Sequence, residues 1–372
     1  MQVGDDPQLL ELLMKDSDQA PEIYRPTNYW AGWTASIARD LSKLGLMDFR
    51  GRKGRTLVGM GLGNDYHPQQ PSIDVFYERR WLRRIFNNRF TQLLPFWSRF
   101  LIYFHDSLNK LLPIRPPPHL APESLREGSY QFTRLLGEKS GARPLDDFTP
   151  SLAGNPDAYV ERGGRAYSWG NLFFYLRYAY CCNYIDFDSI DLMVELGGGY
   201  GRQVEIIKKL HPNVCFLMFD LAPQLYVCER YLSSVFPDSV VSYRDTRDMD
   251  TVPVIEPGKI YMFPNWRFPV VDNLKVDLFW NAQSFQEIEP NVVAHYLGYV
   301  SRQANAVYLH NRRGGAQKGS PGKGGLLEST TLEHYKAALT SLELLDVSAP
   351  WLPIGRRTTE RHDYFDGFWK RA

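Results

Sequence analysis

Hydrophobic and polar positions follow one pattern in the second half of the chain. From residue 191 onward, short apolar runs alternate with stretches in which apolar residues recur every three or four positions. The runs predict strands at 192–196, 214–221, 259–263, 276–282 and 306–311. The stretches between them predict helices at 201–211, 223–236 and 291–304. Alternating strands and helices indicate βαβ units, so we expect an α/β fold with a mostly parallel sheet.

The first half of the chain has long helical patterns and no such alternation. Residues 21–49, 74–112 and 166–185 carry apolar positions at helical spacing, and the proline-rich residues 112–122 predict a stiff connector. With 372 residues, the chain is longer than one ordinary hydrophobic core requires. We therefore expect a helical N-terminal domain at 1–165 and an α/β domain at 166–372.

Composition narrows the class of partner and the compartment. The 43 Lys and Arg residues nearly balance the 42 Asp and Glu residues, so nothing predicts a nucleic-acid partner. The most apolar later stretch, residues 93–112, contains too many ionisable residues for a membrane span, and the acidic N-terminus does not resemble a signal peptide. The four cysteines have no metal-ligand spacing and fit buried thiols in a reducing compartment. We expect a cytoplasmic protein without a transmembrane segment.

Two glycine clusters are candidates for a ligand-binding turn. In the second, residues 197–201 (GGGYG) directly follow a predicted strand and precede a helix, which places free backbone N–H groups at the carboxyl end of a parallel strand. The first cluster, at 56–65, follows a basic loop and is followed by prolines. We interpret it as a glycine loop of the helical domain.

Two acids beside the second cluster indicate the kind of ligand. Asp220 ends the next strand, about 20 residues after the glycines, where a carboxylate can bind both hydroxyls of a ribose. Glu195 precedes the glycines, and the sequence E-L-G-G-G-Y-G departs from the G-x-G-x-x-G of dinucleotide folds. An acid at this point favours a ligand with a positive group and no pyrophosphate. S-adenosylmethionine, which carries a sulfonium and an ammonium group, meets this requirement.

Three segments together resemble a known family. These are VELGGGYGRQVEII, FDLAPQLYVCERYL and VDLFWNAQSFQEIEPNVVAHYL, and they resemble bacterial sugar O-methyltransferases, which are class I S-adenosylmethionine-dependent enzymes with a helical N-terminal extension. The resemblance covers roughly residues 167–311 and is looser at YRPTNYW and YSWGNLFFYLRYAY. It implies a Rossmann-like class I methyltransferase sheet with a helical N-terminal domain, and S-adenosyl-L-methionine as cofactor.

The resemblance also implies roles for individual residues. Glu195 would hold the amino-acid end of the cofactor, Asp220 its ribose hydroxyls, and Leu221 would lie against the adenine. The turn under the cofactor would be shaped by Gly197, Gly199 and Gly201. Further candidates for cofactor binding follow the third and fourth strands: Asn265 and Asn281.

Methyl transfer to a hydroxyl needs a base near the ends of the fourth and fifth strands. His310 and Glu287 are the candidates, and each has a structural alternative: His310 as a strand-end residue, Glu287 as a helix cap. His295 lies in a helical pattern and fits a structural role. The acidic segment 245–250 is interleaved with arginines, which favours a self-paired loop, so we predict no metal site.

The acceptor is expected between the sheet and the N-terminal helices. Aromatic and amide side chains there suit a sugar ring, although packing is an alternative for each of them. The candidates are Tyr24, Trp30, Trp169, Asn171 and Tyr175. The glycine-rich residues 311–328 are either a lid or a connector.

The sequence therefore predicts an S-adenosylmethionine-dependent O-methyltransferase acting on a sugar hydroxyl, in polysaccharide or natural-product glycosylation. One alternative is a methyltransferase for a non-sugar small molecule or a peptide. The other is a non-catalytic glycan- or membrane-surface-binding protein on a methyltransferase scaffold, suggested by the basic aromatic stretch 76–90. The oligomeric state, a homodimer included, stays open.

Overall fold

A computed structural model describes residues 2–51, 122–252, 254–322, 324–353 and 363–372 of the chain. Four features of the sequence lie outside these ranges. They are the glycine cluster at 56–65, the helical pattern at 74–112 with the basic stretch inside it, and all but the last residue of the proline-rich connector.

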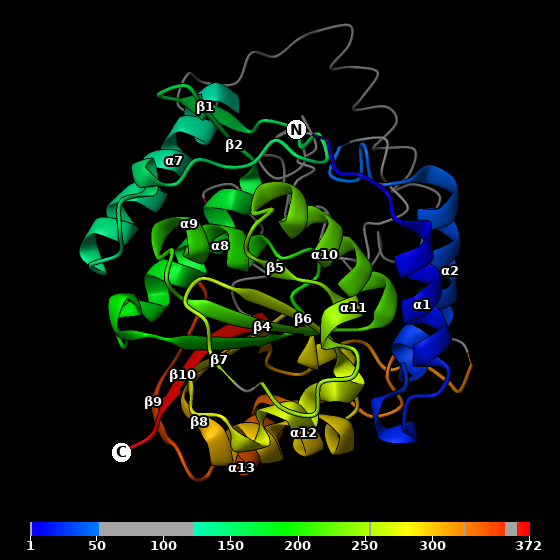
Figure 1. The fold of residues 1–372 in the computed structure, drawn as a ribbon. Coiled ribbons are helices and arrows are strands. Elements are labelled where there is room, and N and C mark those ends of the chain that lie inside the picture. Colours follow the sequence, from blue (N-terminus) through cyan, green and yellow to red (C-terminus); the bar gives the residue numbers. More distant parts are fainter. Residues whose placement is uncertain (1, 52–121, 253, 323, 354–362) are drawn as a thin grey trace, which may run out of the picture.

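The centre of the molecule is an eight-stranded sheet (Figure 1). Its strands are β3 (Leu192–Leu196), β4 (Cys215–Asp220), β5 (Val240–Val241), β6 (Ile260–Pro264), β7 (Val276–Ala282), β8 (Ala304–Arg312), β9 (Glu343–Ser348) and β10 (Tyr364–Lys370). The spatial order is β5-β6-β4-β3-β7-β8-β10-β9, and only β10 runs antiparallel to its neighbours. The five predicted strands are confirmed and form the parallel part of the sheet.

Helices cover both faces of this sheet, as the buried parallel strands require. On one face lie α8 (Trp169–Cys181), α9 (Arg202–Leu210) and α10 (Ala222–Val235). On the other lie α12 (Pro290–Gln303), α13 (Leu332–Ala338) and the 3-10 helix η7 (Asn265–Asn273). The three predicted connecting helices are confirmed as α9, α10 and α12. The strand order reverses direction beside β3, so a crevice forms at the carboxyl ends of β3 and β7.

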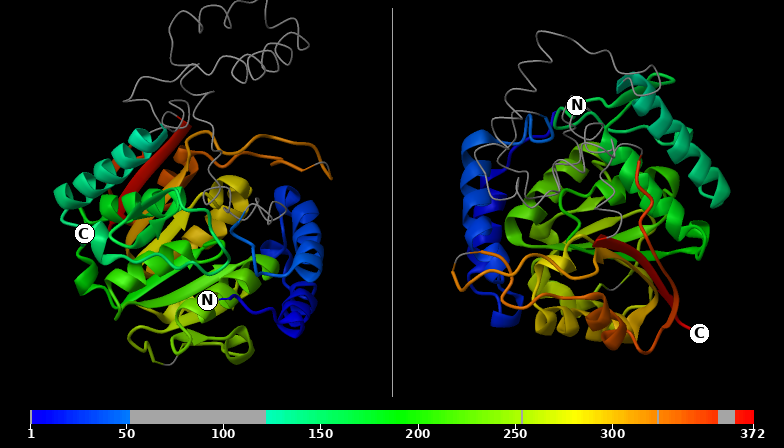
Figure 2. Two further views of the ribbon diagram at one scale, coloured as in Figure 1. Left: turned by 90° about the horizontal axis from the view of Figure 1, so that it is seen from above. Right: turned by 180° about the vertical axis from the view of Figure 1, so that it is seen from behind.

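The described N-terminal helices pack on the same body. They are α1 (Pro7–Ser17), α2 (Asn28–Leu44) and α7 (Pro122–Lys139). A short hairpin of β1 (Val160–Arg162) and β2 (Arg165–Tyr167) follows α7. Helices α1 and α2 lie side by side along one flank, against α10 (Figures 1 and 2). Buried leucines of α1 belong to the hydrophobic cluster that also contains α8, α9 and α10. The two sides of the predicted domain boundary at 165/166 thus share a core, and the boundary itself stays a prediction.

The acidic segment after β5, with its interleaved arginines, differs from the expectation of a self-paired loop. It forms the short helix α11 (Tyr243–Thr246), and its arginines do not pair within their own loop. Arg244 binds Asp6 at 2.8 Å and Arg247 binds Asp16 at 2.6 Å, both from the N-terminal segment. The segment therefore holds the N-terminal helix on the α/β body.

The described ranges contain neither a membrane-spanning helix nor a group of metal-ligating side chains. No helix there combines the length and apolar composition that a membrane span needs. Nor do His, Cys, Asp and Glu side chains of these ranges gather in groups of three or more that could hold a metal ion.

Candidate active site

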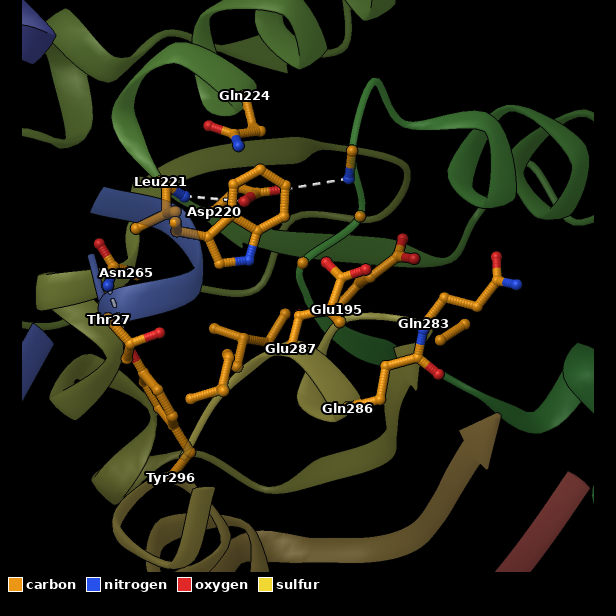
Figure 3. A pocket seen from close by; sticks show the side chains of 18 of the residues that line it. Thr27, Glu195, Asp220, Leu221, Gln224, Asn265, Gln283, Gln286, Glu287 and Tyr296 are labelled. Carbon is orange, nitrogen blue, oxygen red and sulfur yellow. Dashed lines mark hydrogen bonds between the residues drawn. The ribbon is translucent and has the colours of Figure 1, made fainter. Parts of the chain in front are cut away.

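A cavity of about 360 Å³ lies at the carboxyl ends of β3, β4, β6 and β7. Two walls enclose it. The sheet wall consists of the strand ends and the loops that follow them, and the strap wall is the N-terminal strap, residues 23–30, which crosses over them. Figure 3 shows Thr27 of the strap beside Asn265 of the sheet wall, with Asp220, Glu195 and Glu287 around the same space.

The glycine turn, residues 197–201, links β3 to α9. Gly197, Gly199 and Gly201 have φ angles of 76°, 60° and 89°, which favour glycine. A Cβ on Gly197 would lie 2.3 Å from the Ser284 Cβ, and one on Gly201 would lie 2.7 Å from Leu232 Cδ1. Gly197 and Gly199 line the cavity, whereas Gly201 caps α9 behind it. The turn therefore needs glycine at both ends. Gly197 lies close to Ser284 in the cavity lining, and Gly201 packs against Leu232 outside the cavity.

Two acids lie at the floor of the cavity. Asp220 accepts hydrogen bonds from the backbone N–H groups of Gly199 (3.0 Å) and Leu221 (2.8 Å), and burial nevertheless raises its pKa to about 7. Burial, together with the nearby charge of Asp220, raises the pKa of Glu195 to about 8. Within the described part of the chain, Glu195 Oε2 has no hydrogen-bond partner. A cation placed here would favour the ionised form of both acids.

Further polar atoms in the cavity wall have no hydrogen-bond partner among the described residues. They are Thr27 Oγ1, Asn265 Oδ1 and both amide atoms of Gln224. By contrast, the Nδ2 of Asn265 has two hydrogen-bond partners: it donates to the Tyr24 carbonyl oxygen (2.6 Å) and to the Tyr296 hydroxyl (3.0 Å). Buried polar groups are costly when unpaired, so this wall suits a ligand with several polar atoms.

Glu287 lies across the cavity from these groups. It ends the 3-10 helix η8 (Phe285–Glu287) directly after β7, and burial raises the pKa of its carboxyl to about 8. The Tyr29 hydroxyl of the strap donates to its Oε1 at 3.3 Å. A partly buried carboxyl with a pKa near neutrality is suited to accept a proton.

His310 does not line this cavity, contrary to expectation. Its side chain is only 1% exposed, and its Nδ1 lies 2.7 Å from Asp366 Oδ1. The ring packs against Phe173 and Tyr364. The β8–β10 pairing places His310 and Asp366 opposite each other, so the histidine belongs to a buried hydrogen-bonded pair in the sheet.

Asn281 does not line the cavity either. Its Nδ2 donates to the Leu196 carbonyl oxygen at 2.8 Å, and its Oδ1 accepts from Phe285 N and Asn311 Nδ2. These bonds join β3, η8 and β8. Asn281 thus positions the turn that carries Glu287 and does not face a ligand in the cavity.

Three acceptor candidates on α8 lie outside the cavity as well. Asn171 forms a capping box with Ser168, the Tyr175 hydroxyl donates to the Arg143 carbonyl oxygen at 2.7 Å, and Trp169 packs against Phe173. The helix is buried on almost every side because α7 and α9 flank it. Tyr24 and Trp30 of the strap do line the cavity, and the Tyr24 hydroxyl is taken up by His295 Nε2 at 2.8 Å.

The sequence analysis missed several wall residues, among them Gln224, Thr27 and Tyr29. Gln224 lies in the first turn of α10, four residues after Asp220, where the proline at 223 marks a helix start and nothing marks a site. Thr27 lies within YRPTNYW, the segment that the family resemblance touches only loosely. Their role becomes visible only when the strap is placed on the sheet.

Comparisons with known proteins bear on the fold alone. No family model and no curated protein matches the chain. Similar solved structures include the pyocyanin biosynthetic protein PhzM (14% identity, 55% of this chain and 56% of that one, TM-score 0.35) and the mitomycin 7-O-methyltransferase MmcR (10%, 68% and 70%, 0.34). Another is the O-methyltransferase NcsB1 from neocarzinostatin biosynthesis, in complex with S-adenosyl-L-homocysteine and 1,4-dihydroxy-2-naphthoic acid (12%, 54% and 56%, 0.35).

The aligned part spans little more than half the length of PhzM and of NcsB1. With its strand order and crevice, the α/β body has a Rossmann-like fold. Fold does not determine function, so the activity must be argued from the cavity.

Proposed function

We propose that this protein is an S-adenosylmethionine-dependent O-methyltransferase that acts on a sugar hydroxyl. The observation that supports this proposal is a cavity in which Glu195 and Asp220 lie at a glycine turn and which Glu287 of η8 also lines. Glu195 is buried, Asp220 and Glu287 are partly buried, and the pKa values of all three carboxyl groups are raised. Such a site favours a cationic ligand beside two of the acids and a proton acceptor at the third.

The residues of the cavity fit this cofactor. Glu195 would bind its ammonium group, Asp220 its ribose hydroxyls, and Leu221 would lie against the adenine. The polar atoms that lack a partner among the described residues would bind the remaining polar edges of the cofactor; they belong to Thr27, Gln224 and Asn265. When bound, S-adenosylmethionine supplies a methyl group on a positively charged sulfur, which leaves as a neutral thioether.

Glu287 would act as the general base. When the hydroxyl of a bound acceptor takes up the methyl group, its proton would pass to the Glu287 carboxylate. The ionised carboxylate is the active form, and a pKa of about 8 makes it a stronger base than an ordinary glutamate while leaving part of it ionised at neutral pH.

The acceptor would bind between the strap and the sheet wall, with the N-terminal residues acting as acceptor-binding lid. The cavity is lined there by aromatic rings that can pack on a sugar ring: Tyr24, Tyr29, Trp30, Phe174, Tyr200 and Tyr364. The sugar itself rests on the family resemblance of the sequence together with these rings.

An acceptor screen tests the proposal. The purified protein is incubated with S-adenosylmethionine and one of a series of nucleotide sugars, glycosides, phenols or peptides, and S-adenosylhomocysteine release is measured. We expect release that depends on a sugar and is lost in Glu287→Gln. Release with phenols or peptides alone would contradict the sugar assignment and keep the methyltransferase.

A further inference from the structure

The carboxylate of Glu287 meets few groups from outside its own turn. Tyr29 of α2 donates to it at 3.3 Å, and Gln286 is the polar neighbour within η8. Arg312 of β8 favours its charged form, whereas Asp220 of β4 opposes that form. The donor that reaches Glu287 from the N-terminal part of the chain is therefore a tyrosine of the strap.

The turn that carries Glu287 is anchored independently of the strap. Gln286 accepts from Arg312 N at 2.9 Å through its Oε1, and its backbone N–H donates to Asn311 Oδ1 at 3.2 Å. The carbonyl oxygen of Gln286 accepts from Ala316 N at 3.0 Å. The position of the base is thus fixed by β8 and the loop after it, while the donor comes from elsewhere.

Asn28 fixes the position of Tyr29 from the other side. As the first residue of α2, it donates through Nδ2 to the Gly325 carbonyl oxygen at 2.8 Å and accepts from Gly322 N at 2.8 Å. The glycine-rich loop after β8 is thereby tied to the residue that precedes Tyr29. The tie depends on close contact between two segments that lie almost 300 residues apart in the sequence.

We propose that Tyr29 is a positioning residue whose hydrogen bond favours the ionised form of Glu287 over the protonated form, and that Asn28, by binding the glycine-rich loop, keeps Tyr29 in place. The description of Glu287 as a base rests on the proposed function; the link between Tyr29 and the ionisation of Glu287 does not. Burial raises the pKa of Tyr29 to about 12, so its hydroxyl remains a donor throughout the range in which Glu287 titrates.

The physical argument concerns which form of Glu287 the hydrogen bond stabilises. A phenol O–H binds a carboxylate more strongly than a carboxylic acid, so it lowers the pKa of the acid it contacts. Without the hydroxyl, burial and Asp220 would keep Glu287 protonated to higher pH, and Gln286 and Arg312 would be the remaining groups that favour the carboxylate. The Tyr364 hydroxyl of β10 accepts a hydrogen bond from Arg312 Nε at 3.0 Å.

The test measures the titration of Glu287 directly, without any acceptor. Protein labelled with ¹³C at the glutamate carboxyl is titrated by NMR between pH 5 and 10, and Glu287→Gln identifies the signal. We expect Tyr29→Phe to move the midpoint up by about one pH unit, which is a tenfold loss of ionised fraction at neutral pH. Asn28→Ala should move it in the same direction by less.

The matched control is Tyr226→Phe. It removes a hydroxyl that ties the N-terminal segment to α10 through Asp6 N (2.9 Å), away from the cavity, and it should leave the midpoint unchanged. An unchanged midpoint in folded Tyr29→Phe, or an equal shift in Tyr226→Phe, would overturn the proposal. Because no cofactor or acceptor is used, failure to bind S-adenosylhomocysteine would count against the proposed function and not against this link.

Discussion

The two walls of the cavity are built in different ways. The sheet wall comes from short, local motifs: a glycine turn directly after β3 and an acid at the end of β4. The strap wall comes from residues 23–30, which reach the cavity through contacts with residues between 240 and 300 positions away. The sheet wall offers acids, and the strap wall offers aromatic rings and two hydroxyl groups, those of Thr27 and Tyr29.

This difference suggests that the two walls have different roles in binding. The sheet wall holds the acids and the glycine turn to which we assign the cofactor. The strap wall contacts Glu287, the proposed base, through Tyr29, and it contacts Asn265 through the Tyr24 carbonyl oxygen. It also borders the space that we assign to the acceptor. We expect the strap to determine which acceptor enters and how the base is set, so variants of the two walls should fail in different assays.

The largest effect is expected from Asp220→Ala on the sheet wall. Loss of a charge-assisted pair of hydrogen bonds to ribose should weaken S-adenosylhomocysteine binding by roughly 2–4 kcal/mol, or about 30- to 1,000-fold. Calorimetric titration measures this. The matched control is Asp277→Ala, since Asp277 also accepts from two backbone N–H groups, those of Asp191 and Leu192. Equal affinities in both variants would remove Asp220 from the site.

Glu287→Gln should separate chemistry from cofactor binding. Turnover should fall by about 100-fold or more, because the proton acceptor is lost, while S-adenosylhomocysteine affinity stays within about twofold. Steady-state rates and calorimetry on the same preparation test both parts. Glu289→Gln, two residues along and outside the cavity lining, is the control and should retain activity. Near-normal turnover in Glu287→Gln would show that Glu287 is not the base.

Thr27→Val asks whether the strap contributes to cofactor binding. Its Oγ1 has no partner among the described residues, so removing it should leave folding intact and lower S-adenosylhomocysteine affinity about five- to tenfold, the value of one hydrogen bond. Thr34→Val on the same helix is matched, since the Thr34 hydroxyl bonds only within α2, to the Trp30 carbonyl oxygen. Unchanged affinity in Thr27→Val would confine the cofactor to the sheet wall.

The smallest effect concerns pH and stability. Glu195, Asp220 and Glu287 have pKa values of about 8, 7 and 8 in the folded chain, above those of ordinary acids. The folded state therefore binds more protons than the unfolded state near neutrality, and stability is lost as pH rises through 7 to 8. Melting temperature without ligand should fall by about 2–5 °C between pH 6 and 9.

A cationic ligand should reduce this loss. S-adenosylmethionine should raise the melting temperature more at pH 8.5 than at pH 6, and Glu195→Gln should flatten the pH dependence of the free protein. Differential scanning fluorimetry at four pH values is sufficient. A ligand-induced shift of the same size at every pH would contradict the charge pairing.

The sequence predicted the sheet wall well because its signals are local. The strands carry unbroken apolar runs, the glycines require positive φ, and the acids end strands, so Glu195, Gly197, Gly199, Asp220 and Leu221 are all placed at the cavity. Local signals did not distinguish a strand-end residue that faces the cavity from one that faces the core. His310 and Asn281 illustrate this: the first pairs with Asp366 of β10, the strand that no local pattern predicted next to β8.

The strap wall could not be predicted for the opposite reason. Whether Tyr24 or Tyr175 faces the ligand depends on which helix is buried on all sides, and that depends on long-range packing. Thr27 and Gln224 have ordinary helix-start sequences around them, and only the placement of α2 and α10 gives their side chains a cavity to face.

Calorimetric titration of the purified protein with S-adenosylhomocysteine, with NAD in parallel, tests the central claim most directly. We predict micromolar binding of S-adenosylhomocysteine and none of NAD, because the cavity has acids and no pyrophosphate-binding G-x-G-x-x-G turn. Binding of NAD, or of neither compound by folded protein, would contradict the assignment of this cavity to S-adenosylmethionine.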